Sequence, residues 1–324
     1  MKINNVIRLA YINSEPLYKR LENDVRDRLK AAAEARRWFF IYRVKTLESF
    51  AMKIETGRVT NPSLLEDFFA CTIVVPTIND IAVAEEFVYD HYDKLVRRPT
   101  DPLQTHKKSS SFEFDDLRLY VKRKTGLSSA SEDLNDLVFE IQIKTVLQYA
   151  WSVATHDLIY KTDAVSWTKE RIAFQVKAML EHAELAISEA PSLATAKGFD
   201  KKDTYTSEIT ELIVVIQKIW EEDFLPSDMK RLSENISNIL RVVGVTPTKL
   251  DDILHKEIVR NGILPSDLSP YAFIVQALAN NREVDLISKL KTRRKFCLLM
   301  HSGMDLPKWC STHPQCIWIG PKGE

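Results

Sequence analysis

Three polar residues alternate with apolar ones in the segment EIQIK, and their types suit a metal–nucleotide complex. Glu140, Gln142 and Lys144 are spaced two apart, with Ile141 and Ile143 between them. This period of two is typical of a strand with one polar and one apolar face. The polar face offers a carboxylate, an amide and a cation side by side. A carboxylate that faces phosphates can hold Mg²⁺, and its neighbours can orient a substrate.

The segment that follows changes to helical spacing. Apolar residues recur three and four positions apart from Leu147 to Leu158, and His156 lies on a second, polar face of the predicted helix. A ligand on the preceding strand could contact His156. The alternative is an interfacial histidine whose hydrogen bonds serve only the fold.

A second group of polar residues suits a polyphosphate. Arg43 and Lys45 are two apart on a predicted strand, and Ser49 and Lys53 are four apart on the next helix. Cations and a hydroxyl at a strand–helix junction can bind phosphates through charge-assisted contacts. The alternative is a solvated basic surface. Asp67 precedes the apolar run FFACTIVV and is either a surface residue or, paired with Glu140, a ligand of Mg²⁺.

The segment HKKSSSFEF at 106–114 is basic and ends in aromatic residues. Lys107, Lys108 and Phe112 could belong to an ordinary surface loop. They could equally clamp the phosphates and the base of a nucleotide.

The elements that must position these residues form a mixture of strands and helices without strict alternation. We predict helices at 15–37, 46–55, 78–92, 146–161 and 166–187, and strands at 38–45, within 61–76, and at 116–124 and 136–145. This order indicates an α+β fold with a nucleotidyltransferase-like mixed sheet flanked by helices. The pattern lapses near 190–203, so we expect one domain at 1–195 and a mainly helical regulatory or interaction region at 196–324.

Composition limits the class of protein. The chain has 324 residues, 45% of them hydrophobic, a formal net charge of zero and four scattered cysteines. These values indicate a globular protein of the reducing cytoplasm, with no disulfide framework. We expect no membrane span and no signal peptide, because no apolar run approaches the necessary length.

The C-terminal segment carries one weak metal signal. Its cysteines and histidines could supply zinc ligands, namely Cys297, His301, Cys310 and Cys316, with His313 as a further candidate. Their spacing is not a standard one, and reduced, packed cysteines are the alternative.

Taken together and in this order, the polar stretches resemble the synthetase domain of the RelA/SpoT family of (p)ppGpp synthetases, including small and toxic members. The family motif Arg-x-Lys-x-x-x-Ser-x-x-x-Lys is met by Arg43, Lys45, Ser49 and Lys53. The last motif is met at unchanged spacing by Glu140, Gln142, Lys144, Thr145, Trp151, His156, Tyr160 and Lys161. The resemblance covers residues 15–190 approximately.

The resemblance implies a GTP pyrophosphokinase-like enzyme of alarmone synthesis and the stringent response. Such enzymes move the β,γ-pyrophosphoryl group of ATP to the 3′-hydroxyl of a guanine nucleotide. The implied ATP ligands are Arg43, Lys45, Ser49 and Lys53. The implied catalytic and Mg²⁺-binding carboxylates are Asp67 and Glu140. The implied acceptor contacts are Lys107, Lys108, Phe112, Gln142, Lys144 and His156.

Two inner motifs depart from the family. Thr72 stands where the family has an arginine, and Phe114 and Asp116 replace the serine and histidine of the acceptor loop. An aspartate there would repel the phosphates of free GDP or GTP. Two other functions therefore stay open: a toxic synthetase that modifies the tRNA 3′ end or adenine nucleotides, and a degenerate nucleotide-binding sensor. An antitoxin or regulatory partner at the C-terminal region and a homo-oligomer also stay open.

Overall fold

The chain divides into two compact units, Met1–Phe199 and Asp200–Glu324. The computed structural model describes residues 2–57, 59, 62, 65–101, 117–124, 133–159, 165–196, 198, 201–281, 284–292 and 296–320. None of the helices in these ranges is long and apolar enough to cross a membrane.

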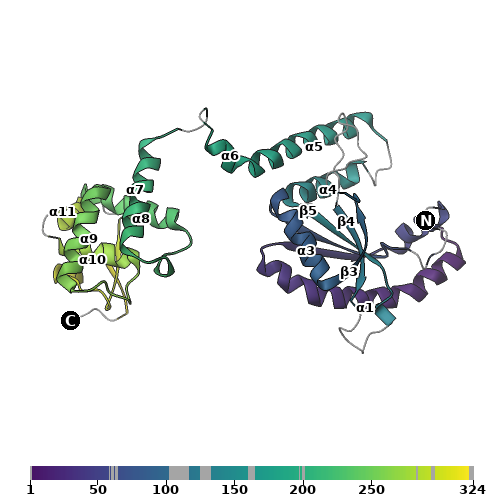
Figure 1. Cartoon of the computed structure of the whole chain (residues 1–324), viewed down its shortest axis with the longest axis horizontal. Coiled ribbons are helices and arrows are strands. Elements are labelled where there is room, and N and C mark those ends of the chain that lie inside the picture. Colours follow the sequence, from purple (N-terminus) through teal and green to yellow (C-terminus); the bar gives the residue numbers. More distant parts are fainter. Residues whose placement is uncertain are drawn as a thin grey trace. The chain divides into compact units, whose positions relative to one another are not determined.

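The first unit is a five-stranded sheet with helices (Figure 1). Its strands are β1 (Phe39–Val44), β2 (Phe69–Val75), β3 (Tyr92–Arg98), β4 (Leu117–Arg123) and β5 (Phe139–Thr145). Its helices are α1 (Asn5–Ala35), α2 (Leu47–Glu55), α3 (Ile81–His91), α4 (Val146–Ile159), α5 (Trp167–Ser188) and α6 (Ala190–Ala194). A short 3₁₀ turn, Ile78–Asp80, leads into α3.

The sheet is mixed, with strand order β1-β2-β5-β4-β3. Strands β2 and β5 are parallel, and the other neighbouring pairs are antiparallel. The predicted α+β class with a mixed sheet is thereby confirmed. The parallel pair β2–β5 at the centre brings Ala70 opposite Glu140 and Thr72 opposite Gln142.

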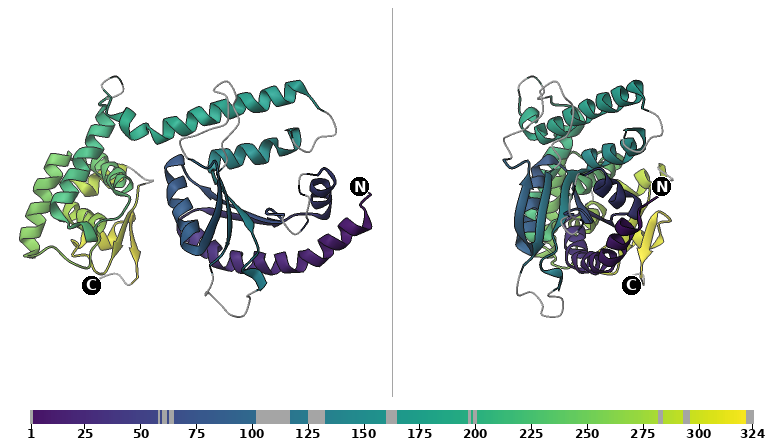
Figure 2. Two further views of the ribbon diagram at one scale, coloured as in Figure 1. Left: turned by 45° about the vertical axis from the view of Figure 1, so that its right-hand side comes forward. Right: turned by 90° about the vertical axis from the view of Figure 1, so that its right-hand side faces the viewer.

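One face of the sheet is apolar and covered by α1 and α3. The buried residues of α1 recur three and four apart, so Leu21, Val25 and Leu29 form one stripe with no exposed surface. This stripe belongs to the same core as Ile141 and Ile143 of β5. Burial of each such side chain stabilises the fold by roughly 1.5–3 kcal/mol. Figure 2 shows α1 running along the sheet.

This unit differs from the sequence prediction most clearly in the start of its first helix and in an unpredicted strand. Helix α1 begins at Asn5, ten residues before the predicted start, because the side chain of Asn4 accepts a hydrogen bond from the backbone N–H of Val6 and caps the helix. The predicted helix 78–92 ends at His91, and the chain continues at once into β3, which the sequence did not predict. Most of this edge strand is exposed, so it lacks the buried alternating pattern on which strand prediction relies.

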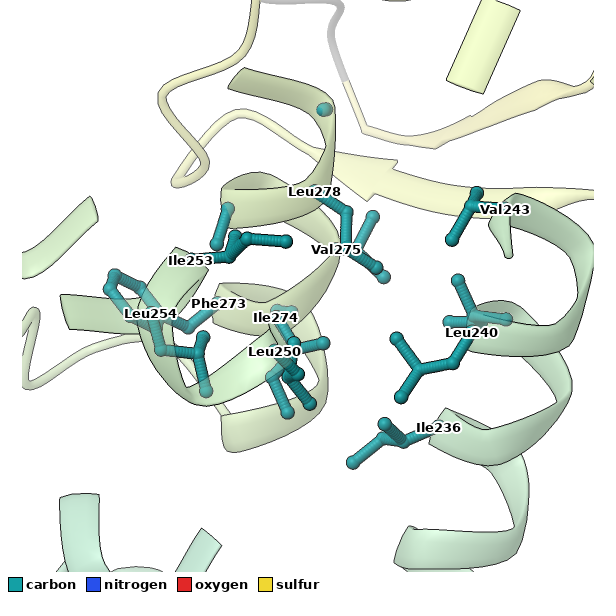
Figure 3. Close-up of a cluster of buried hydrophobic side chains, with 14 of the residues drawn as sticks. Ile236, Leu240, Val243, Leu250, Ile253, Leu254, Phe273, Ile274, Val275 and Leu278 are labelled. Atoms are coloured by element: carbon teal, nitrogen blue, oxygen red, sulfur yellow. The ribbon is translucent and has the colours of Figure 1, made fainter. Parts of the chain in front are cut away.

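The second unit is mainly helical. It contains α7 (Thr204–Ile219), α8 (Met229–Val243), α9 (Pro247–Asn261), α10 (Pro270–Asn280), α11 (Leu286–Thr292) and α12 (Trp309–Thr312). A 3₁₀ turn at Glu222–Phe224 follows α7. Figure 3 shows apolar side chains of α8, α9 and α10 pointing toward one another. The sequence missed a small parallel sheet of β6 (Leu298–His301) and β7 (Cys316–Ile319).

A buried carboxylate joins α9 to α10 in this unit. Glu257 is 4% exposed and accepts hydrogen bonds from Gln276 and Asn280, each at 2.9 Å, and from Arg260. Burial raises the pKa of Glu257, but the hydrogen bonds from Arg260, Gln276 and Asn280 outweigh it and hold the pKa below its usual value. The group is satisfied within the unit, so it serves the fold.

Candidate active site

The second face of the central strands carries polar residues in cross-strand register. Arg43 of β1 is opposite Ala70 of β2, Ala70 is opposite Glu140 of β5, and Glu140 is opposite Tyr120 of β4. The next row places Thr72, Gln142 and Arg118 side by side. Because side chains two apart on a strand share a face, both rows point the same way. The alternation predicted for 140–144 therefore builds one polar surface.

Glu140 lies at the centre of this surface and is only 4% exposed. The hydroxyl of Tyr120 donates a hydrogen bond of 2.8 Å to its Oε2, and the amide of Gln142 donates to its Oε1. Burial, followed by the charge of Glu140, raises the pKa of Tyr120 to about 12. Tyr120 is therefore a protonated donor over the whole physiological pH range.

A separate cluster forms where β1 ends and β2 begins. The Nζ atoms of Lys45 and Lys53 lie 3.1 and 2.5 Å from Oδ2 of Asp67. Burial raises the pKa of Asp67, but the two lysines outweigh it and hold the pKa below its usual value. Burial also lowers the pKa of Lys45, against the opposing effect of Asp67. The second oxygen of Asp67, Oδ1, is buried and has no hydrogen-bond partner among the described residues.

The four residues of the first motif thus take different places. Lys45 and Lys53 hold Asp67, whereas Arg43 lines a pocket on the polar face of the sheet. Ser49 lies in the first turn of α2, where its hydroxyl accepts a hydrogen bond of 3.0 Å from the capping residue Thr46. Its backbone N–H is bound by the same threonine, so its hydroxyl already has a structural role.

The pocket has a volume of about 700 Å³ and lies between the polar face and α4. Its walls include the predicted residues Arg43, Gln142, Lys144 and His156. Glu140 is not part of the lining, but its neighbours Ala70 and Gln142 are. The structure thereby brings the predicted strand residues and the helical histidine to one cavity beside the buried carboxylate.

Helix α5 fixes the wall that α4 contributes. The indole N–H of Trp151 donates a hydrogen bond of 2.8 Å to the carbonyl of Ala173, and the ammonium of the buried Lys177 lies 4.6 Å from the centre of the indole ring. At the start of α4, the side chains of Thr145 and Gln148 both donate to the buried Glu184 of α5. Burial raises the pKa of this carboxyl. Trp151, which the sequence analysis counted as a motif residue, therefore also has a packing role.

Some predicted contacts lie outside the described residues. These are Lys107, Lys108 and Phe112, together with Phe114, Asp116, Tyr160 and Lys161. The assignment of Lys107, Lys108 and Phe112 to the acceptor remains a prediction.

The zinc prediction is not supported. No group of three or more His, Cys, Asp or Glu residues that could hold a metal ion occurs in the part of the chain that the structure describes. Cys297 is exposed, whereas Cys310 and Cys316 are buried in the core of the second unit. Pairing of β6 with β7 puts Cys316 opposite Leu298 and so turns it into the apolar core. Cys310 and Cys316 are free cysteines packed in the core, which agrees with the alternative interpretation of this segment.

Two residues of this surface were not predicted from the sequence. Tyr120 binds Glu140, and Arg118 lines the pocket. Both lie in the segment LRLYVKR, where Arg118, Tyr120 and Lys122 alternate with apolar residues. The alternation itself was a usable signal, but only the register with β5 shows that these side chains flank Glu140.

Comparisons with known proteins give one family match and several similar solved structures. Residues 42–165 match the family model described as the region found in RelA / SpoT proteins. The small alarmone synthetase 1 from Bacillus subtilis is a similar structure, with 17% sequence identity, a TM-score of 0.47 and coverage of 57% of this chain and 97% of that chain. A GTP pyrophosphokinase family protein from Streptococcus pneumoniae has 19% identity, a TM-score of 0.44 and coverage of 54% and 89%. A search of curated proteins found no match.

Proposed function

The chain carries a RelA/SpoT region at residues 42–165, and from this premise we propose that it is an ATP-dependent pyrophosphokinase. It transfers the β,γ-pyrophosphoryl group of ATP to the 3′-hydroxyl of a nucleotide, as in (p)ppGpp synthesis. The resemblance drawn from the sequence motifs implied the same reaction.

One observation carries the proposal. A buried carboxylate, Glu140, adjoins a pocket whose lining includes the cations Arg43, Arg118 and Lys144. Phosphoryl-type transfer needs charge neutralisation and alignment of the reactants more than covalent help from the protein. A cavity of about 700 Å³ is large enough for a nucleotide-sized ligand. The surface therefore supplies the charges and the room that this reaction needs.

The residues present fit a magnesium ion. Asp67 keeps one buried oxygen, Oδ1, without a hydrogen-bond partner among the described residues, and such an oxygen suits a hard cation. Ala70 pairs with Glu140 across the parallel strands, and Asp67 precedes Ala70 by three residues, so both carboxylates lie at the same end of β2 and β5. Mg²⁺ usually takes only one or two protein carboxylates besides phosphates and water. When bound, it would neutralise charge on the phosphates of ATP.

The protein groups have separate tasks in this reaction. Lys45, Lys53 and Arg43 would bind the phosphates of ATP, since the cluster around Asp67 keeps a net positive charge. Glu140 would accept the proton of the attacking 3′-hydroxyl. The hydroxyl oxygen then bonds to the β-phosphorus, and the bond from this phosphorus to the α,β-bridging oxygen breaks. AMP leaves with that oxygen and its electron pair.

The acceptor would occupy the pocket beside Gln142, Lys144 and His156, all of which line it. A guanine nucleotide is the acceptor that the resemblance implies. The replacements Phe114 and Asp116 in the acceptor loop favour an altered acceptor, for which a tRNA 3′ end and adenine nucleotides are the alternatives.

The test is incubation of the full chain with γ-labelled ATP, Mg²⁺ and a panel of acceptors: GDP, GTP, adenine nucleotides and bulk tRNA. We expect label on one acceptor class, together with release of AMP. The matched control is Glu140→Gln under the same conditions. Absence of label on every acceptor, with ATP still bound, would favour the degenerate nucleotide sensor over an enzyme.

A further inference from the structure

We propose that Tyr120 is a positioning residue that aligns Glu140 for proton acceptance. The inference rests on the proposed function, because Glu140 is the group that would take the proton. It concerns a residue that the motifs of the sequence do not include.

The geometry around Glu140 supports this role. Its two oxygens are held by two different donors, Tyr120 on Oε2 at 2.8 Å and Gln142 on Oε1. One donor on each oxygen restrains rotation of the carboxylate about its last side-chain bond. An ionised carboxylate has about four lone-pair sites, so each oxygen keeps one for the acceptor hydroxyl or for Mg²⁺.

Tyr120 is itself held firmly. It lies directly opposite Glu140 in the antiparallel pair β4–β5, and it is 5% exposed. The guanidinium of Arg98, from the edge strand β3, lies 4.7 Å from the centre of its ring. Because the ring of Tyr120 is held in place, its hydroxyl restrains the carboxylate of Glu140 that it binds.

Alignment of this kind acts on the chemical step. Misplacement of a reacting group by about 1 Å can cost 10²-fold in rate. The residues proposed to bind the phosphates of ATP are Arg43, Lys45 and Lys53, and Tyr120 is not among them. Loss of the hydroxyl should therefore lower kcat and leave the KM for ATP unchanged. A group that only stabilised the fold would alter neither value for the folded protein.

The experiment is a double-mutant cycle on the full chain with Tyr120→Phe, Glu140→Asp and both changes. We expect Tyr120→Phe to lower kcat by about 10- to 100-fold at constant KM for ATP. Glu140→Asp withdraws the carboxylate, so Tyr120→Phe should change kcat by less than about 2-fold in that background. Urea unfolding of the four proteins gives a second readout that does not depend on activity. The effects of the two single changes on the free energy of unfolding should be non-additive.

The matched control is Tyr89→Phe. Tyr89 donates to Glu85 at 3.0 Å, so this variant loses the same type of bond in the same unit but outside the site. It should keep the wild-type kcat. Equal kcat for Tyr120→Phe and wild type, or additive effects in either cycle, would overturn the inference while leaving the proposed function intact. Lack of transfer by the wild type would instead overturn the proposed function itself.

Discussion

The ammonium nitrogen of Lys45 lies 3.1 Å from Oδ2 of Asp67, and this oxygen also accepts from Lys53. Two cations of the first motif thus converge on the carboxylate of Asp67. Asp67 has 18% of its side chain exposed and Lys45 has 12%, so solvent screens this cluster only weakly. The cluster gives the motif residues a role in stability besides the proposed role in ATP binding.

A pH-dependent loss of stability should follow from this cluster. The folded-state pKa of Asp67 lies below its usual value, so its contribution is fully present above about pH 4 and is lost as the pH falls through the folded value. We expect Asp67→Asn to lower the free energy of unfolding by about 1.5–3 kcal/mol at pH 7, because two lysines lose a charged hydrogen-bond partner. Urea unfolding from pH 7 to pH 3 measures this difference, which should shrink toward low pH. A difference that stays constant with pH would contradict the role of the ionised carboxylate.

Replacement of the buried carboxylate should abolish pyrophosphate transfer. Glu140→Gln keeps the shape of the side chain but removes its charge and its basicity. We expect a loss of about 10²- to 10⁴-fold in kcat, the range for general acid–base catalysis. Transfer of γ-label is the measurement, with circular dichroism to verify the fold. Activity within about tenfold of wild type would mean that Glu140 lowers the activation barrier by less than ~1.4 kcal/mol. Its assignment as the catalytic base would then be wrong.

Removal of either lysine of the cluster should weaken ATP binding. Lys45→Ala and Lys53→Ala each take away one cation, and the effect should be larger at low salt than at high salt because the contact is ionic. Calorimetric titration with ATP at two salt concentrations tests this. Lys30→Ala is the control, since Lys30 is exposed on α1 beside Glu34. Unchanged ATP affinity in both variants would mean that these lysines serve only the ion pair with Asp67.

The acceptor loop supplies the last prediction. Stacking of a base on an aromatic ring is worth roughly 1–3 kcal/mol, so Phe112→Ala should weaken apparent acceptor affinity by about 5- to 150-fold. Asp116→His removes a negative charge and should improve the use of free GDP or GTP. Steady-state kinetics with GDP and with tRNA as acceptors separate the two effects. Efficient transfer to GDP by the wild type, with Asp116→His neutral and tRNA ignored, would show that the loop does not redirect the acceptor.

The sequence by itself determined several local elements and the types of residue that they carry. The alternation at 140–144 and the helical spacing after Val146 both appear in the structure as β5 and α4. Such patterns are readable because one face of each element meets a core and the other does not. The motif spacing also identified the family region, since it needs only the order of residues along the chain.

The tertiary structure alone decided which of these residues meet. The bond from Tyr120 to Glu140 depends on the register between β4 and β5, which are separated along the chain by a long connection. The convergence of Lys45 and Lys53 on Asp67 depends on how α2 and β1 pack beside the start of β2. Tertiary packing also decides the places of the C-terminal cysteines. Cys310 and Cys316 are buried, whereas Cys297 is exposed. Contacts between distant segments follow from packing and strand pairing. The spacing of residues in one segment indicates which face a side chain takes, but not which strand becomes its neighbour.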